Sequence, residues 1–350
     1  MPLLTTTIGA YPKPDFVPVP DWFRAMGGPD TRHPTRGYLA AIEDMGKEAE
    51  ELFARGVKQA VEDQVGAGID VPTDGEIRRE NYIHYHCRHL EGVDFDTLTP
   101  KDVRGGTYTA ELPSITGPIR AGEHFLPRDF RLAQSFTDRP VKITLPGPMT
   151  IADTTVDLHY DDNPRLCADF AAALNSEILA LVEAGCRWIQ VDEPVFARKP
   201  DEALAYGTET LDRCFHGVPE SVTKIMHMCC GYPDGLDRED YPKADPGSYG
   251  RLAAAVDATV VDAVSIEDAH RHNALTLIES FPNTKVILGV VAIAKSRVEP
   301  VEEIRERLKA ALEHTDPERL IAAPDCGLGL LGRELAVRKL QNLAEAAHSL

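Results

Sequence analysis

Short apolar runs alternate with longer amphipathic stretches along the chain. An apolar run rich in β-branched residues and bounded by turn-forming residues is typical of a buried strand. Eight runs fit this description, at Leu3–Ile8, Ile69–Thr73, Val141–Leu145, Trp188–Val191, Val222–Met226, Val261–Ile266, Val286–Val290 and Leu320–Ala323. Their separation by long polar–apolar stretches predicts parallel strands joined by helices.

The stretches between or after these runs carry apolar residues at three- and four-residue spacing, as the buried face of a helix does. This spacing predicts helices at Glu48–Val65, Arg165–Ala184, Val301–Glu313 and Arg333–Ala347. Pro164 and Pro300 stand at expected helix starts, where proline fits the first turn. Eight strands with intervening helices predict an α/β fold, a (β/α)₈ TIM barrel forming one domain over residues 1–350. A doubly wound sheet is the alternative.

Two segments are unlike plain connections. Residues 13–35 are rich in Pro and Gly, and we expect them to form an ordered loop over one mouth of the barrel. Residues 81–140 are too long for a simple strand–helix connection and contain short alternating runs, which predicts an inserted hairpin or small subdomain. The predicted barrel therefore carries extended loop insertions at its C-terminal mouth.

Composition excludes several classes of partner. The 350 residues are 43% hydrophobic and carry a net charge of −19, which argues against binding to nucleic acid or to an anionic membrane surface. No apolar run approaches the roughly 20 residues that a membrane span needs, and no secretion signal is apparent. The seven cysteines are scattered rather than arranged as a disulfide framework, so a reducing cytoplasm is the expected setting.

Candidate chemistry stands where strands end, the position of active sites in barrels of this type. His227 and Cys229 follow the fifth predicted strand, and Cys326 follows the eighth. Imidazole and thiolate are ligands that Zn²⁺ favours, so the three residues predict a zinc site. Cys230 points to the opposite side if the strand continues. Several thiolates with no obvious base to activate water favour alkyl transfer to a thiol substrate over hydrolysis.

Six motifs in a fixed order then point to a family. They are Ile8-Gly9, Asp74-Gly75-Glu76, Gln190-Val191-Asp192-Glu193-Pro194, His227-Met228-Cys229, Ser265-Ile266-Glu267 and Pro324-Asp325-Cys326-Gly327-Leu328. Together they span nearly the whole chain and resemble the catalytic C-terminal barrel of the cobalamin-independent methionine synthases. The resemblance is to the short single-barrel type, within the wider uroporphyrinogen decarboxylase/methionine synthase-like superfamily.

The resemblance implies a cytoplasmic, zinc-dependent homocysteine S-methyltransferase of methionine biosynthesis. Its zinc ligands would be His227, Cys229, Glu267 and Cys326. Glu267 is the hard oxygen ligand among soft ones, and we expect an incoming thiolate to displace it. Glu76 and Asp192 would bind the amino group of homocysteine, and Asp192 would also position the substrate for catalysis. The backbone of Ile8 and Gly9 would lie near the carboxylate of homocysteine.

The chain departs from the family pattern in ways that bear on the methyl donor. Full-length members carry a second barrel that helps to bind a folate donor, and 350 residues leave no room for one. Ala10 replaces a serine, and Ala294 replaces a histidine expected to protonate the departing folate nitrogen. His270, His272 or Lys295 could supply that proton instead. The donor is therefore either a methylated folate or a methylcobamide, the latter with a corrinoid protein as a possible partner.

Three other functions stay open at this stage. A zinc-dependent alkyltransferase acting on another thiol, similar to the epoxyalkane:coenzyme M transferases, would use the same ligands, although Glu76 and Asp192 argue against a sulfonate thiol. A decarboxylase of the uroporphyrinogen type would need no metal. A zinc-bearing corrinoid or thiol carrier would bind its ligand without turnover.

Overall fold

The computed structural model describes residues 2–17, 19, 38–103, 108–232, 235–238 and 243–350. Most of the loop expected at 13–35 therefore lies outside the described residues. Among the described helices, none is both long and apolar enough to cross a membrane.

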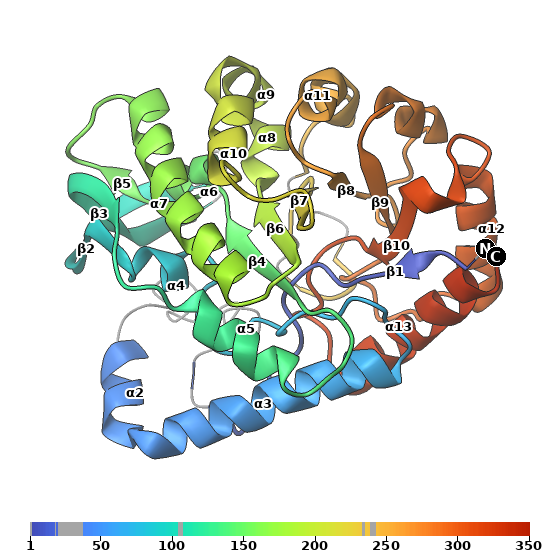
Figure 1. Cartoon of the computed structure of the whole chain (residues 1–350), viewed down its shortest axis with the longest axis horizontal. Coiled ribbons are helices and arrows are strands. Elements are labelled where there is room, and N and C mark those ends of the chain that lie inside the picture. The colour runs from blue at the N-terminus through green and yellow to red at the C-terminus, as the bar shows by residue number, and fades with distance from the viewer. Residues whose placement is uncertain (1, 18, 20–37, 104–107, 233–234, 239–242) are drawn as a thin grey trace.

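A curled sheet of seven parallel strands occupies the centre of the molecule (Figure 1). Its order is β1-β10-β9-β8-β7-β6-β4. The strands are β1 (Leu4–Thr5), β4 (Lys142–Pro146), β6 (Trp188–Asp192), β7 (Thr223–Met228), β8 (Ala263–Glu267), β9 (Lys285–Val291) and β10 (Leu320–Pro324). From β4 onward, each predicted strand is confirmed to within two residues at its ends.

The second predicted strand, Ile69–Thr73, does not form a regular ladder. Single parallel bridges join Thr6 to Val71 and Thr73 to Lys142, on the two edge strands of the sheet. Side chains make further hydrogen bonds to the backbone of this segment. The hydroxyl of Thr6 donates to the carbonyl of Val71 (2.8 Å), and the side chain of Gln64 accepts from the amide of Thr73 (3.0 Å). These side chains therefore bond backbone groups that a regular strand ladder would otherwise pair.

Helices pack around the outside of the sheet, and the long predicted ones are confirmed (Figure 1). The helices are α2 (Tyr38–Met45), α3 (Lys47–Gly66), α4 (His84–Cys87), α5 (Leu126–Gln134), α6 (Pro148–Asp153), α7 (Asn163–Glu183), α8 (Pro194–Arg198), α9 (Pro200–Glu202), α10 (Thr208–Cys214), α11 (Ser248–Asp257), α12 (Val301–Ala311) and α13 (Arg333–His348), with shorter turns η1 (Ala203–Gly207), η2 (Leu275–Ser280) and η3 (Pro317–Arg319). Asp162 caps α7 by accepting from the amide of Arg165 (3.1 Å).

Side chains alternate between the two faces of each strand, so the sheet separates two cores. The larger core lies between the sheet and the helices and includes Met226 and Met228 of β7. A small separate cluster that includes Ile225 lies on the inner face. Because Ile225 points inward, His227 and Cys229 follow it onto the inner side, whereas Cys230 joins the outer core. The alternation of side chains along β7 therefore determines that His227 and Cys229, and not Cys230, point to the inner side of the sheet.

An antiparallel hairpin of β2 (Leu90–Val103) and β3 (Tyr108–Ala121) stands at one side of the sheet, and the short β5 (Val156–Asp157) pairs with β3 (Figure 1). The hairpin is tied to the end of α6 by Lys101. Its ammonium group donates to the carbonyls of Asp153 (2.9 Å) and Thr155 (2.7 Å). The hairpin therefore borders the same end of the sheet as the strand termini.

Candidate metal centre and substrate cavity

Three potential metal ligands meet at the carboxyl ends of β7 and β10. The ligand atoms of His227, Cys229 and Cys326 all lie within 4.8 Å of one another. The Nε2 atom of His227 is 3.5 Å from the sulfur of Cys326. Strand geometry brings them together, because His227 and Cys229 lie two residues apart on one face and Cys326 follows a strand of the same sheet.

The imidazole of His227 is oriented by a neighbouring strand. Its Nδ1 atom lies 2.9 Å from the hydroxyl of Ser265 on β8, which leaves Nε2 facing the thiols. A bond to one ring nitrogen commonly fixes which nitrogen of a metal-binding histidine is the ligand. Ser265 therefore serves the site without facing the metal position.

Electrostatics favour the ligand form of at least one thiol. A hydrogen bond from Cys326, together with the adjacent His227, holds the pKa of the Cys229 thiol well below its ordinary value. The thiolate is the form that binds metals. One imidazole and two sulfurs gathered in a buried position form a soft donor set that suits Zn²⁺ in tetrahedral coordination.

Glu267 lies beside this group but does not belong to it. Its side chain is 3% exposed, and its Oε1 atom accepts from the ammonium of Lys243 at 2.8 Å. Its Oε2 atom accepts from the amide of Cys230 at 3.2 Å. The sequence motif contained Glu267, whereas Lys243 was missed because no pattern relates the two positions.

The two carboxylates expected to hold an amino group line one cavity together with the three potential ligands. Glu76 sits in a left-handed conformation with φ of 55°, which an ordinary side chain rarely adopts. Its Oε1 atom accepts from the hydroxyl of Thr144 (2.7 Å) and from Arg79 (3.3 Å). Gly9 lies directly opposite, and a Cβ atom there would come within 2.4 Å of the same oxygen, so a larger residue would displace the Glu76 carboxylate. Sequence reasoning missed Thr144 and Arg79.

Asp192 stands at the end of β6 and is tied to the first strand through an amide. The Nε2 atom of Gln190 donates to Asp192 Oδ1 (2.7 Å) and to the carbonyl of Ile8 (2.8 Å). Lys142, fully buried on the inner side, donates to the oxygen of the same amide (2.5 Å). Burial raises the pKa of Asp192 to about 7. Ile8 and Gly9 line the cavity, as expected for residues near a substrate.

His270, the weakest of the candidate catalytic groups, is placed differently. It is not among the residues that line the cavity. Its Nε2 atom accepts from the amide of Ala294 (3.2 Å), so the proton resides on Nδ1 and is donated to Asp325 (2.7 Å). Both nitrogens are therefore engaged, and His270 has no proton directed at the cavity. His272 is 67% exposed beside Asp268, and it is not a cavity-lining residue either.

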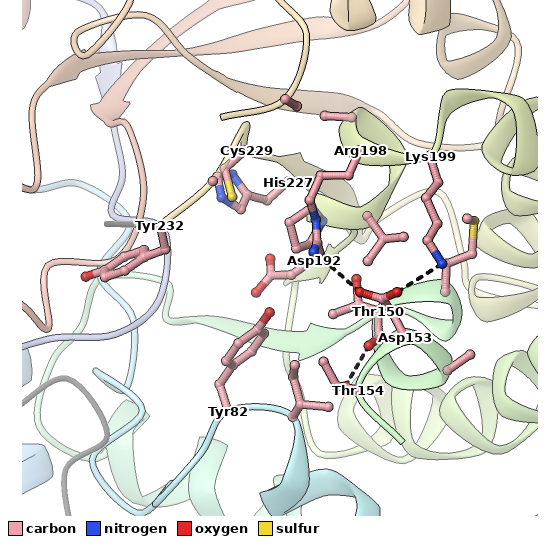
Figure 2. A pocket seen from close by; sticks show the side chains of 18 of the residues that line it. Tyr82, Thr150, Asp153, Thr154, Asp192, Arg198, Lys199, His227, Cys229 and Tyr232 are labelled. Carbon is pink, nitrogen blue, oxygen red and sulfur yellow. Dashed lines mark hydrogen bonds and ion pairs between the residues drawn. The ribbon is translucent and has the colours of Figure 1, made fainter. Parts of the chain in front are cut away.

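The cavity has a volume of about 780 Å³ and extends well beyond the thiols. We call the part lined by His227, Cys229, Cys326, Glu76 and Asp192 the thiol end. The opposite part, the basic end, is lined by Lys101, Asp153, Arg198 and Lys199. Figure 2 shows His227 and Cys229 on one side and Lys199 and Asp153 on the other, with Asp192 and Arg198 between them and Tyr82 below. The sequence patterns indicated only the thiol end.

Ion pairs organise the basic end. The carboxylate of Asp153 accepts from Lys199 (3.0 Å) and Arg198 (3.2 Å) from two sides (Figure 2). Burial lowers the pKa of Lys101. Other carboxylates accompany them: Glu202 lies 3.9 Å from the ammonium of Lys199, and Asp102 also lines the cavity. This end therefore presents cations that are paired with acidic side chains, whereas the thiol end presents the carboxylates of Glu76 and Asp192.

Comparison with known proteins decides the family. A family profile described as cobalamin-independent synthase, catalytic domain, matches residues 3–349. The chain belongs to the cobalamin-independent methionine synthase family. Members of this family are methyltransferases that act on homocysteine. The recognition made from the six sequence motifs is thereby confirmed.

Individual members of the family match the chain over nearly its full length. A methionine synthase of Saccharolobus solfataricus is 32% identical over 350 residues, covering 99% of this chain and 94% of the relative. One from Sulfolobus acidocaldarius is 31% identical and covers 98% and 91%. The solved structure of a B12-independent methionine synthase from a Shewanella species, in complex with selenomethionine, aligns with a TM-score of 0.85 at 28% identity, over 99% and 97% of the two chains.

Proposed function

We propose that this chain transfers a methyl group to the thiol of homocysteine and releases methionine. The observation that carries the proposal is the common cavity that holds the His227, Cys229 and Cys326 group together with the carboxylates of Glu76 and Asp192. A thiol-binding metal position and an ammonium-binding position in one pocket match the two ends of an amino-acid thiol. The Shewanella relative is in complex with selenomethionine, an analogue of the proposed product.

We also propose that the fold is a closed eight-stranded barrel. The bridges from residues 71 and 73 to the two edge strands support this closure, with the segment 69–73 in the eighth position. Closure would place the carboxyl end of that segment, and Glu76 after it, at the same mouth as the ends of β6, β7 and β10. The whole described chain would then form a single domain.

In the proposed mechanism, His227, Cys229 and Cys326 would hold Zn²⁺, and Glu267 beside them would be the fourth ligand. The metal would supply a Lewis acid that lowers the pKa of a thiol from its ordinary value near 8.5. Glu76 and Asp192 accept hydrogen bonds from the substrate ammonium and so aim its sulfur at the methyl carbon. Oriented attack of this kind gains much of its rate from positioning.

The basic end is the proposed location of the methyl donor. The guanidinium of Arg198 and the ammonium of Lys199 line this end and would contact any anionic groups that the donor carries. A methylated folate amine leaves only when protonated, and His270 has no proton directed at the cavity. A methylcobamide needs no proton, and it could be delivered by a corrinoid protein at the mouth. The carboxylates of the thiol end disfavour the alternative of a sulfonate thiol such as coenzyme M.

Mass spectrometry of reaction products tests the proposal directly. Zinc-loaded protein is incubated with homocysteine and, in separate reactions, with methyltetrahydrofolate or methylcobalamin. Methionine is expected with at least one donor, and the productive donor identifies the second substrate. If the protein binds less than about half an equivalent of zinc and forms no methionine with either donor, the proposed function is wrong.

A further inference from the structure

An ion pair between Lys243 and Glu267 stands beside the potential metal ligands. The two side chains are 17% and 3% exposed, and the ammonium and carboxylate meet at 2.8 Å. The other carboxylate oxygen accepts from the amide of Cys230, the residue directly after Cys229. Glu267 is therefore bonded to the residue that follows Cys229, but it is not one of the three residues whose ligand atoms lie within 4.8 Å of one another.

The backbone that carries Lys243 is attached to the same turn. The amide of Ala244 donates to the carbonyl of Cys230 (2.7 Å). Arg271 bridges the two segments, because its guanidinium donates to the carbonyl of Ala244 (2.8 Å) and to the sulfur of Cys230 (3.0 Å). The backbone next to Lys243 is thus held against the turn that presents Cys229, within reach of the Glu267 carboxylate.

A buried carboxylate needs a partner in every state of the site, because leaving it uncompensated is strongly unfavourable. We propose that Lys243 is the positioning residue that takes the Glu267 carboxylate whenever a thiol substrate occupies its place at the metal. This inference deepens the proposed function and rests on its zinc site and thiol substrate. Lysine suits the task, since its ammonium is a compact charge on a flexible stem.

Two opposite consequences follow for binding. In the absence of thiol, Lys243 competes with the metal for Glu267, so it weakens metal binding. In the presence of thiol, Lys243 compensates the displaced carboxylate, so it strengthens thiol binding. A residue that merely supported the local structure would promote both, and the signs therefore separate the two roles.

The variant Lys243→Met tests these signs. We expect zinc to be retained about tenfold more tightly in competition with a chelator, a change typical of groups next to metal ligands. In the zinc-loaded variant, we expect the calorimetric Kd of homocysteine to rise about tenfold. Lys243→Gln, which keeps polarity but loses the charge, is expected to change both affinities in the same directions.

Lys224→Met is a matched control. Lys224 at the start of β7 pairs at 3.2 Å with Asp262, which precedes β8, whereas Glu267 ends β8, so the replacement of Lys224 removes a lysine from an ion pair at the opposite end of the sheet. Neither affinity is expected to change. In a Glu267→Gln background, the effect of Lys243→Met on homocysteine binding should disappear, because no displaced carboxylate remains to be compensated.

The outcomes separate the two proposals. Wild-type protein that binds neither zinc nor homocysteine would refute the proposed function itself. Wild-type protein that binds both, with Lys243→Met weakening both or changing neither, would overturn only the role of Lys243.

Discussion

The thiol end and the basic end of the cavity are built in different ways. The thiol end draws its side chains from the termini of parallel strands and the turns that follow them, and all of them are buried except Cys326, which is partly exposed. The basic end draws on the helices α6 and α8, Lys199 after α8 and the inserted hairpin, and its cations are more exposed, Arg198 at 30% and Lys199 at 42%. Strand ends in one sheet hold groups at fixed separations, whereas helices and insertions can shift or change length. Under the proposed function, the chemistry would lie on the first framework and recognition of the methyl donor on the other.

Removing a thiol ligand from the thiol end is expected to have the largest effect on zinc content and on activity. Cys326→Ser should reduce bound zinc from about one per chain to nearly none and lower kcat/KM at least about 10³-fold, or about 4 kcal/mol. Metal content by mass spectrometry and steady-state rates measure both. Cys214→Ser, at a buried thiol of α10 in the outer core, is the control and should keep its zinc. Full zinc in Cys326→Ser would refute the ligand assignment.

The carboxylates of the thiol end should affect one substrate alone. Glu76→Gln and Asp192→Asn each remove a charge-assisted bond worth about 1.5–3 kcal/mol, so KM for homocysteine should rise roughly 10- to 100-fold. KM for the methyl donor should not change. Asp153→Asn, at the basic end, is the matched control and should leave KM for homocysteine unaltered. Equal increases in the KM for homocysteine in all three variants would show that the two ends do not bind different substrates.

The basic end should show the reverse selectivity with a smaller effect. Replacing Arg198 and Lys199 by Met is expected to raise KM for the donor about three- to tenfold, because partly exposed charges are screened by solvent. KM for homocysteine should stay within about twofold. Measuring both constants at two salt concentrations gives the check, since the donor effect should shrink at high salt. A salt-independent effect would argue against an electrostatic role.

The pH dependence should be the mildest signature and should arise at the thiol end. Burial raises the pKa of Asp192 to about 7 from an ordinary 3.8. Only the ionised form accepts two bonds from an ammonium group, so homocysteine binding should strengthen as pH rises through about 7. Folding stability has the opposite sign, because the contribution of the protonated group is fully present below 3.8 and is lost as pH rises toward 7. Asp192→Asn should flatten the binding profile, and an unchanged profile would assign it to another group.

The sequence predicts the strand ends well and the rest of the cavity poorly, for physical reasons. Buried strands from Lys142 onward are short and rich in apolar residues, and alternation of faces then determines that His227 and Cys229 share a side. The segment 69–73 failed as a regular strand because hydroxyl and amide side chains take its backbone bonds. Lys243 and the basic end depend on contacts between segments with no common periodicity, which local patterns do not encode.

The backbone of Glu76 has a consequence for directed evolution. A left-handed conformation at a residue with a side chain costs of order 1 kcal/mol, a cost that glycine avoids. Glycine at position 76 would relieve this strain but would also remove a carboxylate partner of the buried Arg79 guanidinium, a loss of about 3–5 kcal/mol. Libraries selected for heat resistance alone should therefore retain glutamate at position 76, so the residue proposed to bind the substrate ammonium is also kept by the demands of folding.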